Sequence, residues 1–160
     1  MLRSLAFALT LIVFLGGCLK ESQRKCSYDE CAYKAPASEI QAVKDYLAAH
    51  NITATEHCSG LFYRVENPGT GTRPNGCSYV LANYKGMLTN GYVFDESRPG
   101  GVPFEMNGVI PGWTNGLQQV KAGGRIHLYI PPSLGYGSAA NGDIPAYSIL
   151  IFEVDLLGVE

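Results

Sequence analysis

Two segments in the second half of the chain carry an apolar side chain at every second position, and this period of two constrains the fold most. Between Arg125 and Ile130 the first set is Ile126, Leu128 and Ile130, and Arg125, His127 and Tyr129 lie between them. Between Ser148 and Leu157 the apolar set is Leu150, Phe152, Val154 and Leu156. Such alternation is typical of strands with one buried face. The sequence therefore predicts a sheet whose apolar face must be covered by another element.

The cover is a short helix predicted over Trp113–Val120, the only helical pattern in the second half. Lys121-Ala122-Gly123-Gly124 ends it, since Gly is the usual residue after a helix C-terminus. Asn90-Gly91 predicts a hairpin because both positions of a type I′ turn need positive φ. Further strands are expected over 61–65, 78–87 and 92–94. We predict an α+β fold, with a curved antiparallel β-sheet wrapped around one short α-helix.

An extra N-terminal helix is expected over Ser38–His50. Apolar residues recur there at helical spacing, at Ile40, Val43 and Leu47. Ser38 and Gln41 fit a capping box, and Asn51 is expected to end the helix. At about three turns it would be marginal alone in water, so it must pack on the rest of the chain.

The first residues are typical of an export signal. Arg3 provides a basic region, and the apolar run from Leu5 to Leu15 is too short to span a bilayer. The run ends at Leu15-Gly16-Gly17-Cys18, which resembles a bacterial lipoprotein signal over residues 1–17 with Cys18 as the lipid-bearing residue. The alternative is an ordinary secretory signal followed by a chance Cys. Residues 18–37 are mostly polar and are predicted to tether the lipid to the domain.

This arrangement predicts a lipid-anchored protein of the bacterial cell envelope. Leu19 after Cys18 resembles sorting to the outer membrane. The sequence does not distinguish a periplasmic from a surface-exposed position.

Charge and cysteine usage argue against a nucleic-acid-binding protein and against a metal-binding one. The formal net charge is −2 and no basic stripe occurs, which argues against nucleic-acid binding. Four cysteines beyond Cys18 fit two disulfides in an exported chain, with three possible connectivities left open: Cys26, Cys31, Cys58 and Cys77. No CxxC pair occurs and the three histidines are scattered, so no metal site is predicted.

Seven short motifs follow one another at compatible spacings: Asn83-Tyr84-Lys85-Gly86, Val93-Phe94-Asp95-Glu96-Ser97, Pro103-Phe104, Val109-Ile110-Pro111-Gly112-Trp113, Leu134-Gly135-Tyr136-Gly137, Ile144-Pro145 and Leu150-Ile151-Phe152-Glu153-Val154. In this order they resemble bacterial FKBP (tacrolimus-binding) peptidyl-prolyl cis–trans isomerases. The resemblance covers residues 59–160, so residues 38–58 are interpreted as a separate N-terminal helical segment.

The resemblance implies a binding site for proline. The ring of a substrate proline would lie on the indole of Trp113, with Asp95 and Tyr136 as polar groups at the rim. The backbone N–H of Ile144 would donate to a substrate carbonyl. The walls would be Tyr84, Phe94, Phe104, Val109, Ile110 and Phe152.

The resemblance also implies the partners. They would be proline-containing unfolded or partly folded polypeptides and tacrolimus-like macrolides, and no cofactor is expected. Two features depart from the family pattern and bear on substrate preference. Met106 stands where the family often has an aromatic residue, and the loop from Ser138 to Asp143 is short and polar.

These residue types suit the reaction. Rotation about an X–Pro bond faces a barrier of about 18–20 kcal/mol because amide resonance is lost at the twisted state. An apolar aromatic site disfavours the planar, dipolar amide and can fit the twisted one. No proton need move, so the lack of a nucleophile or general base among these residues is expected.

Three functions follow as hypotheses. The first is a peptidyl-prolyl cis–trans isomerase that assists folding of exported proteins. The second is a non-catalytic chaperone or peptide-binding lipoprotein that uses the same groove. The third is a surface lipoprotein whose fold serves as a spacer for adhesion.

Overall fold

A computed structural model describes residues 26–160, so the predicted signal peptide and Cys18 lie outside the described residues. One seven-stranded sheet dominates it, and every strand pair is antiparallel. Its spatial order is β1-β2-β6-β7-β3-β4, with β5 also paired to β3. The strands are β1 (Thr55–Glu56), β2 (Phe62–Asn67), β3 (Tyr79–Leu88), β4 (Val93–Glu96), β5 (Val102–Glu105), β6 (Gly124–Ile130) and β7 (Leu150–Val159).

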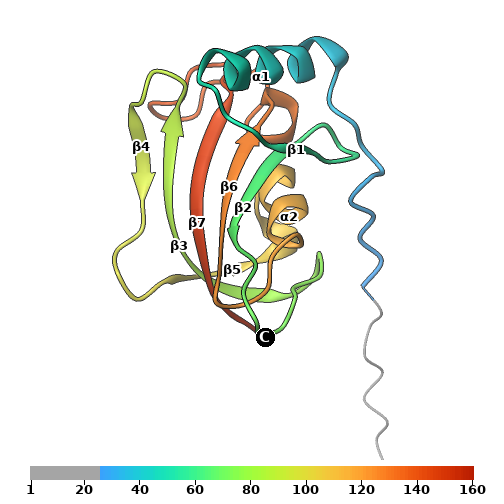
Figure 1. Ribbon diagram of the computed structural model, residues 1–160, viewed down its shortest axis with the longest axis vertical. Coiled ribbons are helices and arrows are strands. Elements are labelled where there is room, and N and C mark those ends of the chain that lie inside the picture. Colours follow the sequence, from blue (N-terminus) through green and yellow to red (C-terminus); the bar gives the residue numbers. More distant parts are fainter. Residues whose placement is uncertain (1–25) are drawn as a thin grey trace, which may run out of the picture.

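Two helices accompany the sheet. Helix α1 (Ala37–Ala49) lies across one end of the sheet, and helix α2 (Pro111–Leu117) lies against one face (Figure 1). Two 3₁₀ turns, η1 (Met106–Gly108) and η2 (Pro132–Leu134), flank α2 and β6 in the chain. The predicted α+β fold with an extra N-terminal helix is confirmed. Within residues 26–160 neither helix combines the length and hydropathy needed to cross a bilayer.

The predicted alternation in β6 and β7 is present, with two exceptions: Tyr129 and its cross-strand partner Ile151 are buried although they point to the other face. Ile126, Leu128 and Ile130 are fully buried. Tyr129 points to the opposite face and is buried too, because Tyr46 of α1 lies over it with ring centroids 6.4 Å apart. The helix therefore covers part of the face opposite α2.

The start of α1 differs from the prediction. The N-cap is Pro36, and no side chain caps the helix. Ser38 lies inside the first turn, so the predicted capping box is wrong, and Gln41 instead donates to Asp45 at 2.8 Å. Pro36 explains the earlier start, because its fixed φ sets the chain direction and the helix begins at the next residue. Asn51 ends the helix as predicted, with a φ of 54° that Asn tolerates.

Two disulfides fasten the segment before α1 to the domain. They join Cys26 to Cys77 and Cys31 to Cys58, which is one of the three connectivities that the sequence leaves open. Ala35 in the same segment is buried, and its N–H donates to the carbonyl of Ser59 at 2.9 Å. The described part of the predicted tether is therefore held against the domain.

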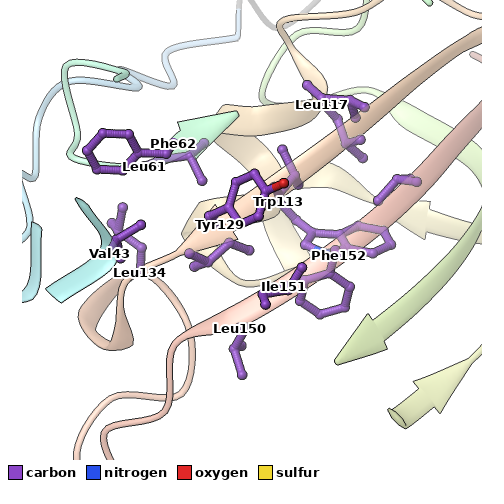
Figure 2. Packing of buried hydrophobic residues seen from close by; sticks show 14 of the residues in the cluster. Val43, Leu61, Phe62, Trp113, Leu117, Tyr129, Leu134, Leu150, Ile151 and Phe152 are labelled. Atoms are coloured by element: carbon purple, nitrogen blue, oxygen red, sulfur yellow. The ribbon is translucent and has the colours of Figure 1, made fainter. Parts of the chain in front are cut away.

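Side chains from both helices and the central strands form one continuous core (Figure 2). Val43 and Leu47 of α1 belong to it together with Leu117 of α2. Because α1 shares this core, it gains the tertiary packing that a helix of its length needs.

Candidate active site

A hollow of about 320 Å³ opens between α2 and the concave face of the sheet. Nine of its ten lining residues are among the ten predicted as site residues. The lining is mostly aromatic and aliphatic: Tyr84, Phe94, Asp95, Phe104, Gly108, Val109, Ile110, Trp113, Tyr136 and Phe152. Gly108 is the member that the sequence did not indicate, and Ile144 is the predicted residue that does not line the hollow.

The floor of the hollow is the indole of Trp113, which is only 4% exposed yet lines the open space. Three rings meet it edge to face. The centroid distances are 5.3 Å to Tyr84, 5.0 Å to Phe104 and 5.3 Å to Phe152. Such edge-to-face pairs each contribute about 0.5–1.5 kcal/mol beyond their buried area, so the indole is held in one orientation.

The Pro-Gly before Trp113 and a second glycine explain why α2 can bring the indole so close to the sheet. Pro111 occupies the first turn of α2, where its missing N–H costs no hydrogen bond. A Cβ added at Gly112 would lie 2.5 Å from the side chain of Ile130 on β6. One added at Gly116 would lie 2.5 Å from Leu128. The two glycines therefore let α2 pack directly on β6.

The polar rim contains a hydrogen-bonded pair from neighbouring strands. The hydroxyl of Tyr84 on β3 donates to Oδ2 of Asp95 on β4 at 2.6 Å. Burial, and then the hydrogen bond to Asp95, raises the pKa of Tyr84 to about 12. The phenol is therefore neutral at ordinary pH and remains a donor.

Tyr136 supplies the other side of the rim. It is 40% exposed and follows η2, in a turn whose Gly137 has a φ of 68°. The Gly137 N–H donates to the carbonyl of Pro132 at 2.8 Å, which fixes the turn. Tyr136, a lining residue, thus adds a further polar side chain to the pair that Tyr84 and Asp95 form.

The role predicted for Ile144 does not fit the geometry. Its side chain is buried, and its N–H donates to the carbonyl of Asn141 at 3.0 Å, while the Asn141 N–H donates back at 2.9 Å. This two-bond bridge within the loop leaves the Ile144 N–H occupied rather than free for a substrate carbonyl. Within residues 26–160 the N–H of Ile110, the N-cap of α2 and a lining residue, has no hydrogen-bond partner. Ile110 is therefore the better-placed backbone donor, and the N-cap position before Pro111 was the signal for it.

Met106 lies elsewhere. It is fully buried beneath α2 and does not line the hollow, and its carbonyl accepts from the hydroxyl of Thr114 at 2.6 Å. Met106 thus joins η1 to α2 and affects the site only through the position of that helix.

A second hollow of about 290 Å³ lies beside β3 but has a different character. Its lining is mainly charged and polar, including Lys85, Glu96, Arg125, Glu153 and Asp155. Charged walls keep water in place, whereas the aromatic hollow can desolvate a ligand. We therefore take the hollow above Trp113 as the candidate active site.

The family model for FKBP-type peptidyl-prolyl cis-trans isomerase matches residues 71–157, which are more than half of the chain and include every residue that lines this hollow or was predicted to. The chain belongs to this family.

Curated FKBP-type relatives agree. The isomerase FkpA of Aeromonas hydrophila is 42% identical over 123 residues, which are 73% of this chain and 45% of that protein. FkpA of Escherichia coli K12 is 48% identical over 104 residues, 64% of this chain and 38% of the relative. This chain thus spans less than half the length of these relatives.

Solved FKBP-type structures share the fold. The crystal structure of FkpA from Escherichia coli has a TM-score of 0.70 at 41% identity, over 78% of this chain and 60% of that one. A peptidyl-prolyl cis-trans isomerase from Pseudomonas syringae has a TM-score of 0.68 at 31% identity, over 79% of this chain and 98% of that one. The second comparison covers nearly all of the neighbour's chain.

Proposed function

We propose that this chain catalyses cis–trans isomerisation of X–Pro bonds in exported polypeptides. The observation that carries the proposal is the open apolar hollow whose floor is the immobilised indole of Trp113. A proline ring is the one side chain that is both apolar and bonded to its own backbone nitrogen. Seating that ring on the indole brings the X–Pro bond to the rim, beside Tyr84 and Asp95.

The rate gain comes from differential binding. The planar amide is dipolar and well solvated, and twisting localises the carbonyl and makes the nitrogen more basic. A dry aromatic wall disfavours the planar form. In the described part of the chain the N–H of Ile110 has no partner, and this N–H and the hydroxyl of Tyr136 would be the donors to the carbonyl of a twisted bond. Shortening the half-time from tens of seconds to milliseconds needs about 5.5 kcal/mol of preferential transition-state binding.

The test compares two aromatic residues in a protease-free isomerase assay. Phe94 is half-buried in the wall of the hollow, whereas Tyr79 is 53% exposed on β3 and does not line it. We expect Phe94→Ala to lower kcat/KM at least about tenfold, or about 1.4 kcal/mol, and Tyr79→Ala to leave it unchanged. Equal rates in the two variants, both folded, would place the reaction elsewhere.

The non-catalytic alternative predicts a different outcome. A chain that suppresses aggregation of an unfolded protein but has no isomerase rate would act as a binding module. Phe94→Ala would then weaken that suppression, because the same wall would hold the bound segment.

We also propose that the chain is exported and lipid-anchored through Cys18 at the outer membrane. The signal-like residues 1–17 support this, as do two disulfides, which form in oxidising compartments. Cys18→Ser should abolish lipid labelling and move the protein to the soluble fraction of lysed cells. Protease treatment of intact cells that carry the unaltered chain would degrade it if it is exposed on the surface and spare it if it faces the periplasm.

A further inference from the structure

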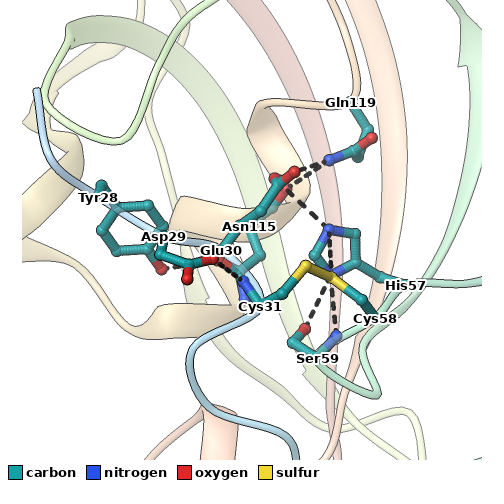
Figure 3. The surroundings of a disulfide bond; sticks show 9 residues. All are labelled: Tyr28, Asp29, Glu30, Cys31, His57, Cys58, Ser59, Asn115 and Gln119. Atoms are coloured by element: carbon teal, nitrogen blue, oxygen red, sulfur yellow. Dashed lines mark hydrogen bonds and ion pairs between the residues drawn. A yellow bond between two sulfur atoms is a disulfide. The ribbon is translucent and has the colours of Figure 1, made fainter.

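The disulfide between Cys31 and Cys58 lies beside an imidazole and a carboxylate, remote in sequence from the residues of the hollow (Figure 3). The Sγ atom of Cys58 is 3.6 Å from Nδ1 and 3.7 Å from Nε2 of His57. The same Nε2 is 3.4 Å from Oε2 of Glu30. Both cysteines are exposed, while the His57 side chain is only 8% exposed. Three potential ligand groups, from Cys31, His57 and Cys58, therefore converge at an accessible point, and the Glu30 carboxylate lies beside the imidazole.

Hydrogen bonds hold the two non-sulfur groups in place. The Ser59 N–H donates to Nδ1 of His57 at 3.2 Å, and the Ser59 hydroxyl lies 2.9 Å from the same nitrogen. Nδ1 is thus the acceptor of a neutral imidazole, and Nε2 carries the proton toward Glu30. Gln119, just beyond α2, donates to the Glu30 carboxylate at 3.3 Å. Both groups are aimed before any ligand arrives.

We propose that reduction of the Cys31–Cys58 disulfide turns this cluster into a Zn²⁺ site. The two thiolates and Nε2 of His57 would be ligands, and the Glu30 carboxylate would close the fourth position. Two sulfurs, one imidazole and one carboxylate form a donor set that Zn²⁺ accepts in tetrahedral geometry. Within residues 26–160 this is the one group in which three His, Cys, Asp or Glu side chains bring their ligand atoms within 4.8 Å of one another.

The distances suit a tetrahedral ion. Zn–S bonds of about 2.3 Å and Zn–N bonds of about 2.0–2.1 Å place sulfur and nitrogen about 3.6 Å apart at the tetrahedral angle. The observed separation between Cys58 Sγ and His57 Nε2 is 3.7 Å. Because this sulfur is almost as close to Nδ1, at 3.6 Å, the Cys58 side chain must also turn toward Nε2 once the disulfide is broken, and the Glu30 carboxylate must move in to complete the set.

The chemistry balances with a dithiol as reductant. Thiolate attack on the disulfide passes two electrons to the two sulfurs, each of which gains a proton, and the dithiol leaves as a disulfide. Metal binding then releases the two thiol protons. On binding at Nε2 the imidazole proton moves to Nδ1, so the bond from the Ser59 N–H to Nδ1 is given up and Nδ1–H donates to the Ser59 hydroxyl, a partner of the kind that fixes metal-bound histidines.

Contacts other than the disulfide keep the ligands near one another after reduction. The Ala35 N–H donates to the carbonyl of Ser59 at 2.9 Å and joins the two chain segments. Two backbone hydrogen bonds close the turn that carries His57 and Cys58. The His57 N–H donates to the Leu61 carbonyl at 2.8 Å, and the Gly60 N–H donates to the His57 carbonyl at 2.8 Å. The reduced cluster is therefore expected to stay assembled rather than disperse.

The test uses the full chain with Cys18→Ser, which removes the fifth thiol. The chain is reduced with a dithiol, freed of the dithiol without oxygen, and titrated with Co²⁺ as an optical probe and with Zn²⁺ against a coloured chelator. We expect one ion per chain, thiolate-to-cobalt absorption, and no binding to the oxidised chain. Adding Cys26→Ser and Cys77→Ser should leave the affinity unchanged, because that pair lies outside the cluster.

The matched control is a second histidine. His50 is exposed and its ring nitrogen Nδ1 lies 2.8 Å from the Tyr46 carbonyl, away from the cluster, so the His50→Gln chain should bind Zn²⁺ as the parent does. Removing a hydrogen-bond partner of a metal ligand lowers metal affinity by roughly 10–100-fold. Ser59→Ala should lower the Zn²⁺ affinity within that range, and His57→Gln, which removes a ligand, should lower it by more. Glu30→Gln should weaken binding and leave the thiolate absorption in place. Circular dichroism confirms that each variant is folded.

Three results would overturn the proposal: equal Zn²⁺ affinity in the oxidised and reduced chains, equal affinity of the His57 and His50 variants, or loss of binding when Cys26 and Cys77 are replaced. Unchanged affinity of Glu30→Gln would remove Glu30 from the ligand set.

Discussion

Gly86 on β3 offers a direct way to move one wall of the hollow. It pairs with Asp95 of β4 on one side and with Phe152 of β7 on the other. A Cβ added there would lie 2.6 Å from two ring carbons of Phe94 and 2.8 Å from the Phe152 ring. Carbon atoms pack best at about 3.5–4.0 Å, so the rings must retreat by about 1 Å. Phe152 is buried, whereas Phe94 stands on an edge strand, so Phe94 is the ring that moves.

The expected result of Gly86→Ala has two parts. Overpacking of this kind lowers the free energy of unfolding by about 1–3 kcal/mol, and the chain stays folded. The displaced wall lowers kcat/KM for isomerisation by about 10–100-fold, because a shift of about 1 Å at a reacting site costs that much. Urea unfolding and the protease-free isomerase assay measure the two effects on the same sample.

Gly158→Ala is the matched control, since it also adds a methyl group to a strand. Its Cβ would lie 3.8 Å from Leu81, an ordinary contact, and Gly158 does not line the hollow. It should change neither stability nor rate appreciably. A folded Gly86→Ala chain with the rate of the Gly158→Ala chain would refute the reasoning that the Phe94 wall shapes the transition state.

Three further predictions follow from packing, titration and cross-linking. Trp113→Ala should lower the free energy of unfolding in urea by about 3–5 kcal/mol, because it removes the ring at the centre of the aromatic cluster; a loss under 1 kcal/mol, within the range of surface changes, would contradict this. Tyr84 has a pKa of about 12, so the folded chain keeps a proton that the unfolded chain loses above about pH 10. The contribution of Tyr84 to the free energy of unfolding is therefore complete below pH 10 and is lost as the pH rises to 12. In urea unfolding at several pH values, the Tyr84→Phe chain should lack this part of the decrease in stability. Identical dependence on pH in the parent and the variant would refute the prediction. Replacing Cys26 and Cys77 by Ser should lower the free energy of unfolding by about 4 kcal/mol, because the disulfide restricts the entropy of the unfolded chain across a separation of 51 residues. Equal stability of the parent and the double variant in urea without a reductant would refute this.

The sequence predicts well whatever a short period or a local motif encodes. The inward set of β6 follows from alternation alone. The helix expected over Trp113–Val120 exists but lies closer to the N-terminus, at Pro111–Leu117, because Pro111 suits the first turn of a helix. Membership of the family, predicted from the order of the motifs, is confirmed by the family model. That nine of the predicted residues line one hollow is a fact of the structure, and their roles in the reaction stay predictions.

Features that depend on contacts across the chain were not predictable. Strand β5 contains Pro103, which argues against a strand, yet it is tolerated because β5 pairs only with β3 at an edge. Strand β1 has two residues, too few for any pattern. The bridge that occupies the Ile144 N–H is a property of loop geometry. The approach of His57 to Cys31 depends on which cysteines pair, and spacing leaves that choice open.

The bond between Cys26 and Cys77 also has a mechanical consequence. Cys77 stands two residues before β3, which pairs with β7, β4 and β5 and so lies deep in the hydrogen-bonded network. Tension applied at the N-terminal end of the described chain would therefore be delivered through a covalent link into this strand, and α1 would carry little of the load. In a single-molecule pulling experiment from that end, the sheet of oxidised chains should unfold in one step at high force. In reduced chains, α1 should detach first at a lower force.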